Sequence, residues 1–132
     1  MSTRKTEIMA TVLVVDDEES IVQFVSELLR REGYRVIGAS GAEEAVASLA
    51  AERPDVAIVD LVMPGKGGMT LIMDELRKVP GLGIVAMSGR IPLGGDSFAA
   101  FSSQFGVSSF LLKPFTPEDL AEAVRKALEK QN

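Results

Sequence analysis

The apolar residues of this chain fall into two alternating patterns. Short runs that are apolar almost throughout occupy residues 10–15, 34–39, 55–59, 82–87 and 107–112. Runs of this length and composition are typical of parallel strands that are buried on both faces. Between the runs, apolar residues recur at helical spacing. These segments predict helices at about residues 20–32, 41–53, 69–79, 97–105 and 117–130.

Alternating strands and helices favour a parallel sheet, because each helix carries the chain back to the edge where the next strand begins. Such crossovers are almost always right-handed. The sequence therefore predicts an α/β fold with helices on both faces of a five-stranded parallel sheet. We expect the flavodoxin-like, doubly wound (βα)5 arrangement with strand order 2-1-3-4-5, whose crevice lies beside the first and third strands.

Three short motifs predict where helices begin and end. Ser40 and Glu43 have the spacing of a capping box, in which each side chain bonds the free backbone N–H of the other residue. Thr116 and Pro117 are typical of an N-cap and the first helical position. Gly33 follows the first helical segment and predicts its end.

The chain of 132 residues is long enough for one domain with a continuous core. We expect residues 1–8 to form a flexible tail and residues 9–130 to form the domain, with no output domain attached. A formal net charge of −5 argues against general binding to nucleic acid. No apolar stretch is long enough to span a membrane, and no secretory leader is recognisable. We therefore expect a soluble cytoplasmic protein that binds neither nucleic acid nor membrane.

The chain contains no cysteine and no histidine, which limits its possible chemistry. Catalysis by a thiol or an imidazole is excluded, and so are metal sites built from sulfur or nitrogen side chains. Any metal ion must therefore be a hard cation held by oxygen atoms.

Polar side chains follow four of the five predicted strands. Asp16 and Asp17 come after the first strand, Asp60 after the third, Ser88 after the fourth and Lys113 after the fifth. In the predicted topology these strand ends share one rim of the sheet. Three carboxylates there would repel one another unless a cation lies among them. We expect Mg²⁺ or Mn²⁺, with Asp17 and Asp60 as direct ligands and Asp16 acting through a water.

This set of groups suits phosphoryl transfer. A metal ion can neutralise local charge and bridge an incoming phosphoryl group. An in-line carboxylate, which we assign to Asp60, can act as the nucleophile and form an aspartyl-phosphate. Lys113 supplies a positive charge for one phosphate oxygen, and Ser88 supplies a hydroxyl donor for another. We interpret the neighbouring Glu18 and Glu19 as favourable charges at a helix N-terminus.

Four motifs, in this order along the chain, resemble the receiver domain of response regulators in two-component phosphorelays. They are Val14–Asp17, Asp60–Gly65, Met87–Gly89 and Lys113–Phe115. The resemblance covers about residues 10–130 and implies that Asp60 accepts a phosphoryl group from a phosphohistidine. The donor would be a sensor histidine kinase or a histidine phosphotransfer protein. The resemblance further implies signalling to a downstream protein, or onward relay of the phosphoryl group, rather than enzymatic turnover.

The resemblance also implies a specific metal site. Mg²⁺, or Mn²⁺ in its place, would bind Asp17, Asp60 and the backbone carbonyl of Val62, and Asp16 would assist.

The same resemblance implies a switch. Phosphorylation would draw Ser88 toward the phosphate, and Phe110, at the aromatic switch position, would fill the space that opens. The face built by the fourth helix, the fifth strand and the fifth helix would be remodelled. The resemblance also leads us to expect a cis peptide bond between Lys113 and Pro114.

Three features depart from the family pattern. Lys66 stands where the family often has an apolar residue, followed by Gly67 and Gly68 where an acid–glycine pair is common. The segment after the fourth strand is a few residues longer than usual, with the excess at residues 90–95, and we expect this loop to change its order on activation. Phe110 lacks the hydroxyl of a tyrosine, so it can switch only by packing.

Two other functions are less well supported. A phosphohydrolase that proceeds through an aspartyl-phosphate usually has an acid two residues after the nucleophile, where this chain has Val62. A pseudo-receiver, which would act as a binding module without phosphorylation, is disfavoured because none of the expected site residues is missing.

Overall fold

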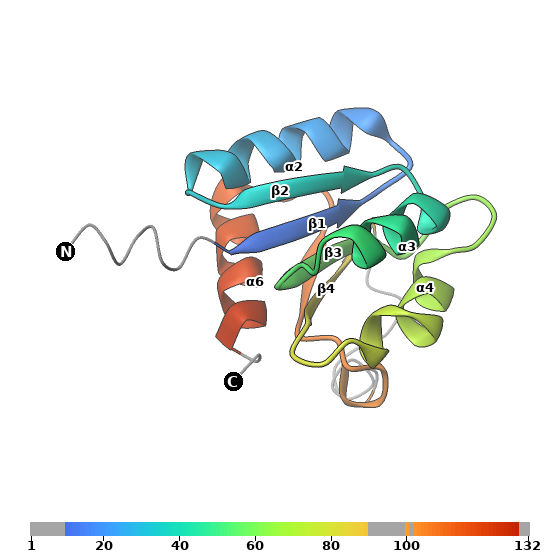
Figure 1. Ribbon diagram of the computed structural model, residues 1–132. Helices are drawn as coiled ribbons and strands as arrows, with labels where there is room; N and C mark the ends of the chain where they lie inside the picture. The colour runs from blue at the N-terminus through green and yellow to red at the C-terminus, as the bar shows by residue number, and fades with distance from the viewer. Residues whose placement is uncertain (1–9, 90–99, 101, 130–132) are drawn as a thin grey trace.

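The computed structural model describes residues 10–89, 100 and 102–129, and in this part of the chain five strands alternate with helices (Figure 1). The strands are β1 (Thr11–Val15), β2 (Arg35–Ala39), β3 (Val56–Asp60), β4 (Gly83–Ser88) and β5 (Ser109–Leu112). The helices are α2 (Glu19–Arg31), α3 (Ala42–Ala51), α4 (Gly68–Asp74), the short 3-10 helix η1 (Leu76–Lys78) and α6 (Pro117–Glu129). Residues 102–105 are also helical. The predicted tail at 1–8, the long loop at 90–95 and the start of the helix predicted at 97–105 lie outside the described residues.

All the strand pairings are parallel, and the sheet order is β2-β1-β3-β4-β5. This order confirms the predicted doubly wound fold. The chain steps outward in one direction from β1 to β2 and in the other direction from β3 to β5. A crevice therefore opens at the carboxyl ends of β1 and β3, which is where open α/β sheets bind ligands.

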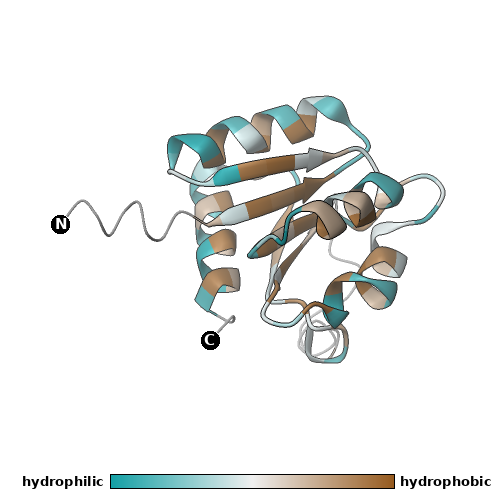
Figure 2. Ribbon diagram, viewed as in Figure 1, coloured by the Kyte–Doolittle hydropathy of each residue, from teal (hydrophilic) through white to brown (hydrophobic). Residues whose placement is uncertain are grey.

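Helices cover both faces of the sheet, with α2 and α6 on one face and α3 and α4 on the other (Figure 1). Successive side chains of a strand point to opposite faces, so each strand serves two cores. In β1, Val12 and Val14 belong to the core under α2 and α6, whereas Leu13 and Val15 belong to the core under α3 and α4. Figure 2 accordingly shows apolar strands and helices that are polar in part. Burial on both faces explains why the strands read as continuous apolar runs.

The predicted end of α2 and the predicted start of α6 match the structure. Gly33 lies just after α2 with a φ of 98°, a left-handed conformation that glycine adopts without strain. At α6, the hydroxyl of Thr116 accepts a hydrogen bond from the N–H of Asp119 (3.0 Å), and the Asp119 carboxylate accepts one from the N–H of Thr116 (3.1 Å). This reciprocal pair is a capping box.

The capping box predicted for Ser40 and Glu43 is wrong by one position. α3 has Gly41 as its N-cap, with no side-chain capping bond, and the Glu44 carboxylate accepts the hydrogen bond from the Ser40 N–H. Glutamate stands at two adjacent positions of the first turn, so the residue pattern alone did not determine which of them reaches back.

The helix predicted at residues 69–79 is divided into α4 and η1. Leu71, Ile72 and Leu76 are nevertheless all buried, so the apolar pattern correctly identified the inward face of this segment. No helix in the described ranges is long and apolar enough to cross a membrane.

Candidate functional site at the carboxyl edge of the sheet

The sheet brings the predicted polar residues to one edge. Asp60 is the last residue of β3, Ser88 is the last residue of β4, and Lys113 follows β5 directly. Asp16 and Asp17 follow β1. Because neighbouring strands are parallel, their carboxyl ends lie at the same edge of the sheet, and these side chains come together from four separate parts of the sequence.

Asp16 and Asp60 are held in the same way. Each is almost completely buried. One carboxylate oxygen of Asp16 accepts a hydrogen bond from the backbone N–H of Glu18 (2.9 Å). One carboxylate oxygen of Asp60 accepts a hydrogen bond from the backbone N–H of Val62 (3.1 Å). These local turns fix both carboxylates and leave the second oxygen of each for other partners.

Lys113 bridges the second carboxylate oxygen of Asp16 and that of Asp60. Its Nζ atom donates hydrogen bonds to Oδ2 of Asp16 (3.0 Å) and to Oδ2 of Asp60 (3.3 Å). Its side chain is only 19% exposed. The peptide bond between Lys113 and Pro114 is cis. The ammonium thus lies between two buried carboxylates that come from different strands.

The surroundings of Asp60 and Lys113 shift the pKa of each group. Burial raises the pKa of the Asp60 carboxyl above its ordinary value, and the charge of Asp16 adds to this effect. The Val62 N–H and the Lys113 ammonium act in the opposite direction but do not cancel it. Burial alone would lower the pKa of Lys113, yet the hydrogen bonds and charges of Asp16 and Asp60 outweigh it and raise that pKa. The site therefore keeps Lys113 charged and still disfavours the negative charge of Asp60.

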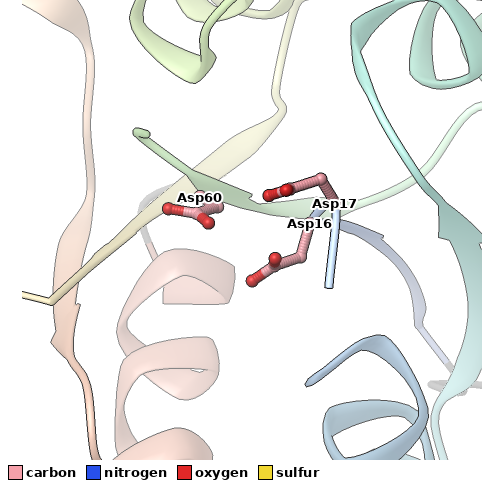
Figure 3. A group of neighbouring side chains, drawn as sticks. All are labelled: Asp16, Asp17 and Asp60. Carbon is pink, nitrogen blue, oxygen red and sulfur yellow. The ribbon is translucent and has the colours of Figure 1, made fainter. Parts of the chain in front are cut away.

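The carboxylates of Asp16, Asp17 and Asp60 could hold a metal ion. Each offers an oxygen atom, and these atoms all lie within 4.8 Å of one another (Figure 3). Three carboxylates face one ammonium, so the cluster carries more negative than positive charge. Oxygen ligands and a surplus of negative charge suit a hard divalent cation such as Mg²⁺. The donor set therefore fits the predicted metal.

Ser88 lies at the same edge as this cluster, whereas Phe110 lies farther back on β5, opposite Ala86 of β4. Ser88 is buried, with 5% of its surface exposed, and its backbone carbonyl accepts a hydrogen bond from the N–H of Lys113 (2.7 Å). Phe110 lies on β5 and packs, partly buried, against the core under α3 and α4. The backbone thus connects the end of β4 directly to the residue that carries the site's ammonium.

Two residues of the loop after β3 are exposed. The Val62 residue is 74% exposed, so an apolar side chain rather than an acid borders the site on its solvent side. Lys66 is half-exposed and lies 3.9 Å from the carboxylate of Asp74, an ion pair on the outside of α4. Among the described ion pairs Lys66 has no partner in the acidic cluster.

Two features of the site were not predicted from the sequence. The Glu18 carboxylate lies 3.6 Å from the Nζ of Lys113, so this residue does more than place charge at the start of α2. A Cβ atom on Gly68 would come within 2.0 Å of the carbonyl oxygen of Asp60, so α4 rests directly on the end of β3. The run of acids after β1 and the paired glycines at the start of α4 were visible in the sequence, but the contact each makes depends on the fold.

Comparison with known proteins identifies relatives over nearly the whole chain. The family model described as the response regulator receiver domain matches residues 12–125. The transcriptional regulatory protein YvrH of Bacillus subtilis (strain 168) is 34% identical over 125 residues, which cover 92% of this chain and 50% of that protein. The chain spans about half the length of the curated relatives it matches.

Solved structures of similar fold agree with this match. A CheY-like response regulator receiver domain protein from Methanospirillum hungatei JF-1 superposes with a TM-score of 0.80 at 28% identity, covering 93% of this chain and 96% of that one. The response regulator protein TrrA from Thermotoga maritima, in complex with Mg²⁺ and BeF, gives a TM-score of 0.76 at 28% identity, covering 91% and 100%. The matched residues include all of the acidic cluster, and the chain belongs to the response regulator receiver domain family of two-component systems.

Proposed function

We propose that this chain is a phosphoacceptor module in which Asp60 receives a phosphoryl group from a phosphohistidine. The observation that carries the proposal is the position of Asp60, which is buried at a strand end, contacts the ammonium of Lys113 and lies beside the carboxylates of Asp16 and Asp17. A carboxylate so placed has a cationic partner and also belongs to a set of oxygen atoms that can bind a metal ion. Aspartyl-phosphate formation uses every one of these groups.

The transfer balances without any other reactant. A carboxylate oxygen of Asp60 forms a bond to phosphorus while the bond between phosphorus and the donor's imidazole nitrogen breaks. The electron pair of that bond returns to the imidazole, which then takes up a proton. The Val62 N–H holds the other Asp60 oxygen and so orients the carboxylate for attack.

The remaining residues have separate roles in this proposal. Asp16, Asp17 and Asp60 would hold Mg²⁺, or Mn²⁺ in its place, with the backbone carbonyl of Val62 as a further ligand. When bound, the ion neutralises carboxylate charge and offers positive charge to the phosphoryl oxygens. Lys113 pairs with another phosphoryl oxygen once it leaves the Asp60 oxygen that it contacts at 3.3 Å.

The Ser88 hydroxyl would donate to a third phosphoryl oxygen and so report phosphorylation. Its support is its place at the end of β4, next to β3 in the sheet. Phe110 would respond by packing, because it is only partly buried and lies on the strand that Lys113 terminates.

The proposed partners follow from this chemistry. The phosphoryl donor is a sensor histidine kinase or a histidine phosphotransfer protein, which implies action in the cytoplasm. The output is a protein–protein contact made by residues 9–130, or onward relay, and this domain itself does not bind nucleic acid. Support for the last point is the formal net charge of −5. The module is a signalling domain that assists its own phosphorylation and dephosphorylation rather than a turnover enzyme.

A phosphodonor assay tests the proposal. The full chain is incubated with acetyl phosphate and Mg²⁺, and intact mass spectrometry should detect the addition of one phosphoryl group that Asp60→Asn abolishes. Asp74→Asn is the matched control, because this exposed aspartate pairs with Lys66 outside the cluster. Labelling of Asp60→Asn at the wild-type level would overturn the assignment. Sustained release of phosphate from a simple phosphoester would favour a phosphohydrolase instead.

A further inference from the structure

Glu18 is a third carboxylate on the Lys113 ammonium, and it differs from the other two. Its Oε1 lies 3.6 Å from Nζ, against 3.0 Å for Asp16 and 3.3 Å for Asp60. Its side chain is 62% exposed, whereas those of Asp16 and Asp60 are 0% and 7% exposed. Glu18 is therefore the partner of Lys113 on the solvent side, farther away but reachable without entering the acidic cluster.

The two buried partners of Lys113, Asp16 and Asp60, are also proposed ligands of the metal ion. Lys113 contacts Oδ2 of Asp16 and Oδ2 of Asp60, while the other oxygen of each is occupied by a backbone N–H. A metal ion held by these aspartates competes with the ammonium for the same oxygens. A partly buried ammonium that loses its partners is strongly disfavoured unless another carboxylate replaces them. The release of Lys113 therefore opposes metal binding.

Glu18 is positioned to become the main ion-pair partner of the Lys113 ammonium. It is the N-cap residue of α2, but its side chain makes no capping bond to the helix. Its backbone N–H is bonded to Asp16, which fixes the start of its side chain next to the carboxylate that Lys113 must leave. A small movement of Nζ toward solvent would exchange the Asp16 contact for the Glu18 contact.

We infer that Glu18 is a positioning residue that receives the Lys113 ammonium when a divalent cation occupies Asp16, Asp17 and Asp60. This inference rests on the proposed function, since it assigns Glu18 a part in metal loading of the same site. In the metal-free protein two aspartates already hold Lys113, so loss of Glu18 has little effect there. In the metal-bound protein Glu18 is the carboxylate that remains for Lys113, so its loss weakens metal binding.

Titration calorimetry with Mg²⁺ on the full chain tests this inference. Glu18→Gln should weaken binding about two- to fivefold, the range expected for one exposed ion pair. Glu19→Gln is the matched control: it removes the same charge one residue away, and among the described contacts Glu19 makes no ion pair with Lys113. Its effect should be less than half as large. An equal effect of the two substitutions would mean that only general charge matters and would overturn the inference.

A double-mutant cycle with Lys113→Met separates the direct mechanism from simple charge attraction. If Glu18 acts through Lys113, Glu18→Gln changes Mg²⁺ affinity no more than Glu19→Gln does in the Lys113→Met background. An undiminished effect of Glu18→Gln in that background would reject the inference. If Lys113→Met does not fold, the ε-methylene resonances of Lys113 serve in its place. In the Mg²⁺-saturated protein Glu18→Gln should shift them more than Glu19→Gln, and equal shifts count against the inference.

The two proposals fail in different ways. If the wild-type chain binds no Mg²⁺, or if Asp17→Asn binds it as well as wild type, the proposed function and this inference both fail. If Asp17→Asn abolishes binding while Glu18→Gln and Glu19→Gln behave alike, the proposed function stands and the role of Glu18 is rejected.

Discussion

At the scale of single residues, Asp60 carries a negative charge that its surroundings compensate only in part. Burial is the main reason that its pKa is raised. Asparagine at this position removes the charge, while Lys113 keeps its contacts with Asp16 and Glu18. We expect Asp60→Asn to increase the free energy of unfolding of the metal-free protein by about 1 kcal/mol, a common size for one substitution. Urea unfolding in the presence of a chelator measures this, and Mg²⁺ should stabilise wild type more than the variant.

The stability gained by Asp60→Asn should depend on pH. The pKa of Asp60 in the folded protein is above the ordinary value of 3.8, so between those two values the folded state binds the proton more tightly than the unfolded state does. Wild type therefore loses stability relative to the variant as pH rises through this window. The difference is small below the ordinary pKa, grows as pH rises, and is constant above the raised pKa. A difference that is the same in acid and at neutral pH would contradict the explanation.

The residues of the acidic cluster could be predicted because parallel strands put all their carboxyl ends on one edge. A charged residue that terminates an apolar run must then lie at that edge, as Asp60 and Lys113 do. Glu18 could not be identified in this way. It follows the strand by several residues, and its ion pair depends on how far the long side chain of Lys113 extends across the sheet. The spacing of apolar residues along the chain does not predict contacts between long, flexible side chains.

At the scale of elements, the start of α4 is pressed against the end of β3. A Cβ atom on Gly68 would lie 2.0 Å from the Asp60 carbonyl oxygen, whereas one on Gly67 would approach no backbone atom closer than 3.6 Å. Gly67 also has an ordinary φ of −73°. Gly68→Ala must therefore push α4 or the Asp60 backbone aside, and we expect it to cost about 2 kcal/mol or more in the free energy of unfolding.

Gly67→Ala is the matched control for that substitution. It should change the free energy of unfolding by less than about 1 kcal/mol, because alanine loses less backbone entropy on folding but is a poorer N-cap of α4 than glycine. The two variants also differ at the site, since only Gly68→Ala moves Asp60. Chemical unfolding combined with Mg²⁺ titration should thus show lower stability and weaker binding for Gly68→Ala alone. Equal losses in the two variants would indicate that general loop stiffness, rather than contact with Asp60, matters at this turn.

The helix caps provide a second comparison between elements. Thr116 makes a side-chain capping bond to a helix N–H at α6, whereas the side chain of Ser40 caps no helix N–H of α3. The backbone N–H and the hydroxyl of Ser40 both interact with the exposed Glu44 carboxylate. We expect Thr116→Ala to lower the free energy of unfolding by about 1 kcal/mol. Ser40→Ala keeps the N–H that bonds Glu44, and its effect should stay within about 0.5 kcal/mol. Thermal unfolding of the two variants measures both, and similar losses would contradict the assigned caps.

At the scale of the whole molecule, the topology was predictable because the strands are short, mostly apolar and separated by helices. A doubly wound sheet, with helices packed on both sides, covers both faces of such strands. The exact division of the chain into helices was less predictable. One predicted helix is divided into α4 and η1, yet Leu71, Ile72 and Leu76 are all buried, as one continuous helix would also bury them. The spacing of apolar residues therefore did not indicate the division. A pattern of burial determines which face of a segment points inward more firmly than it determines the backbone geometry.

The site is also connected to an edge of the sheet. β5 is an edge strand, bonded to β4 on one side, and Lys113 is tied to β4 through the Ser88 carbonyl (2.7 Å). A phosphoryl group on Asp60 that engages Ser88 and Lys113 would pull on the end of β5 and move Phe110, which is only partly buried. β2, the opposite edge strand, ends without any of the proposed phosphoryl-binding groups.

Adding beryllofluoride and Mg²⁺, which together imitate the phosphorylated state, should therefore shift the amide resonances of β5 more than those of β2. Because the effect runs through the Ser88 end of β4, Ser88→Ala should reduce the shifts on β5 while leaving Mg²⁺ affinity close to that of wild type. Asp60→Asn should abolish the response to beryllofluoride altogether. Equal shifts on the two edge strands, or a response that Ser88→Ala leaves unchanged, would mean that the change at Asp60 does not reach Phe110 through the connection between β4 and β5.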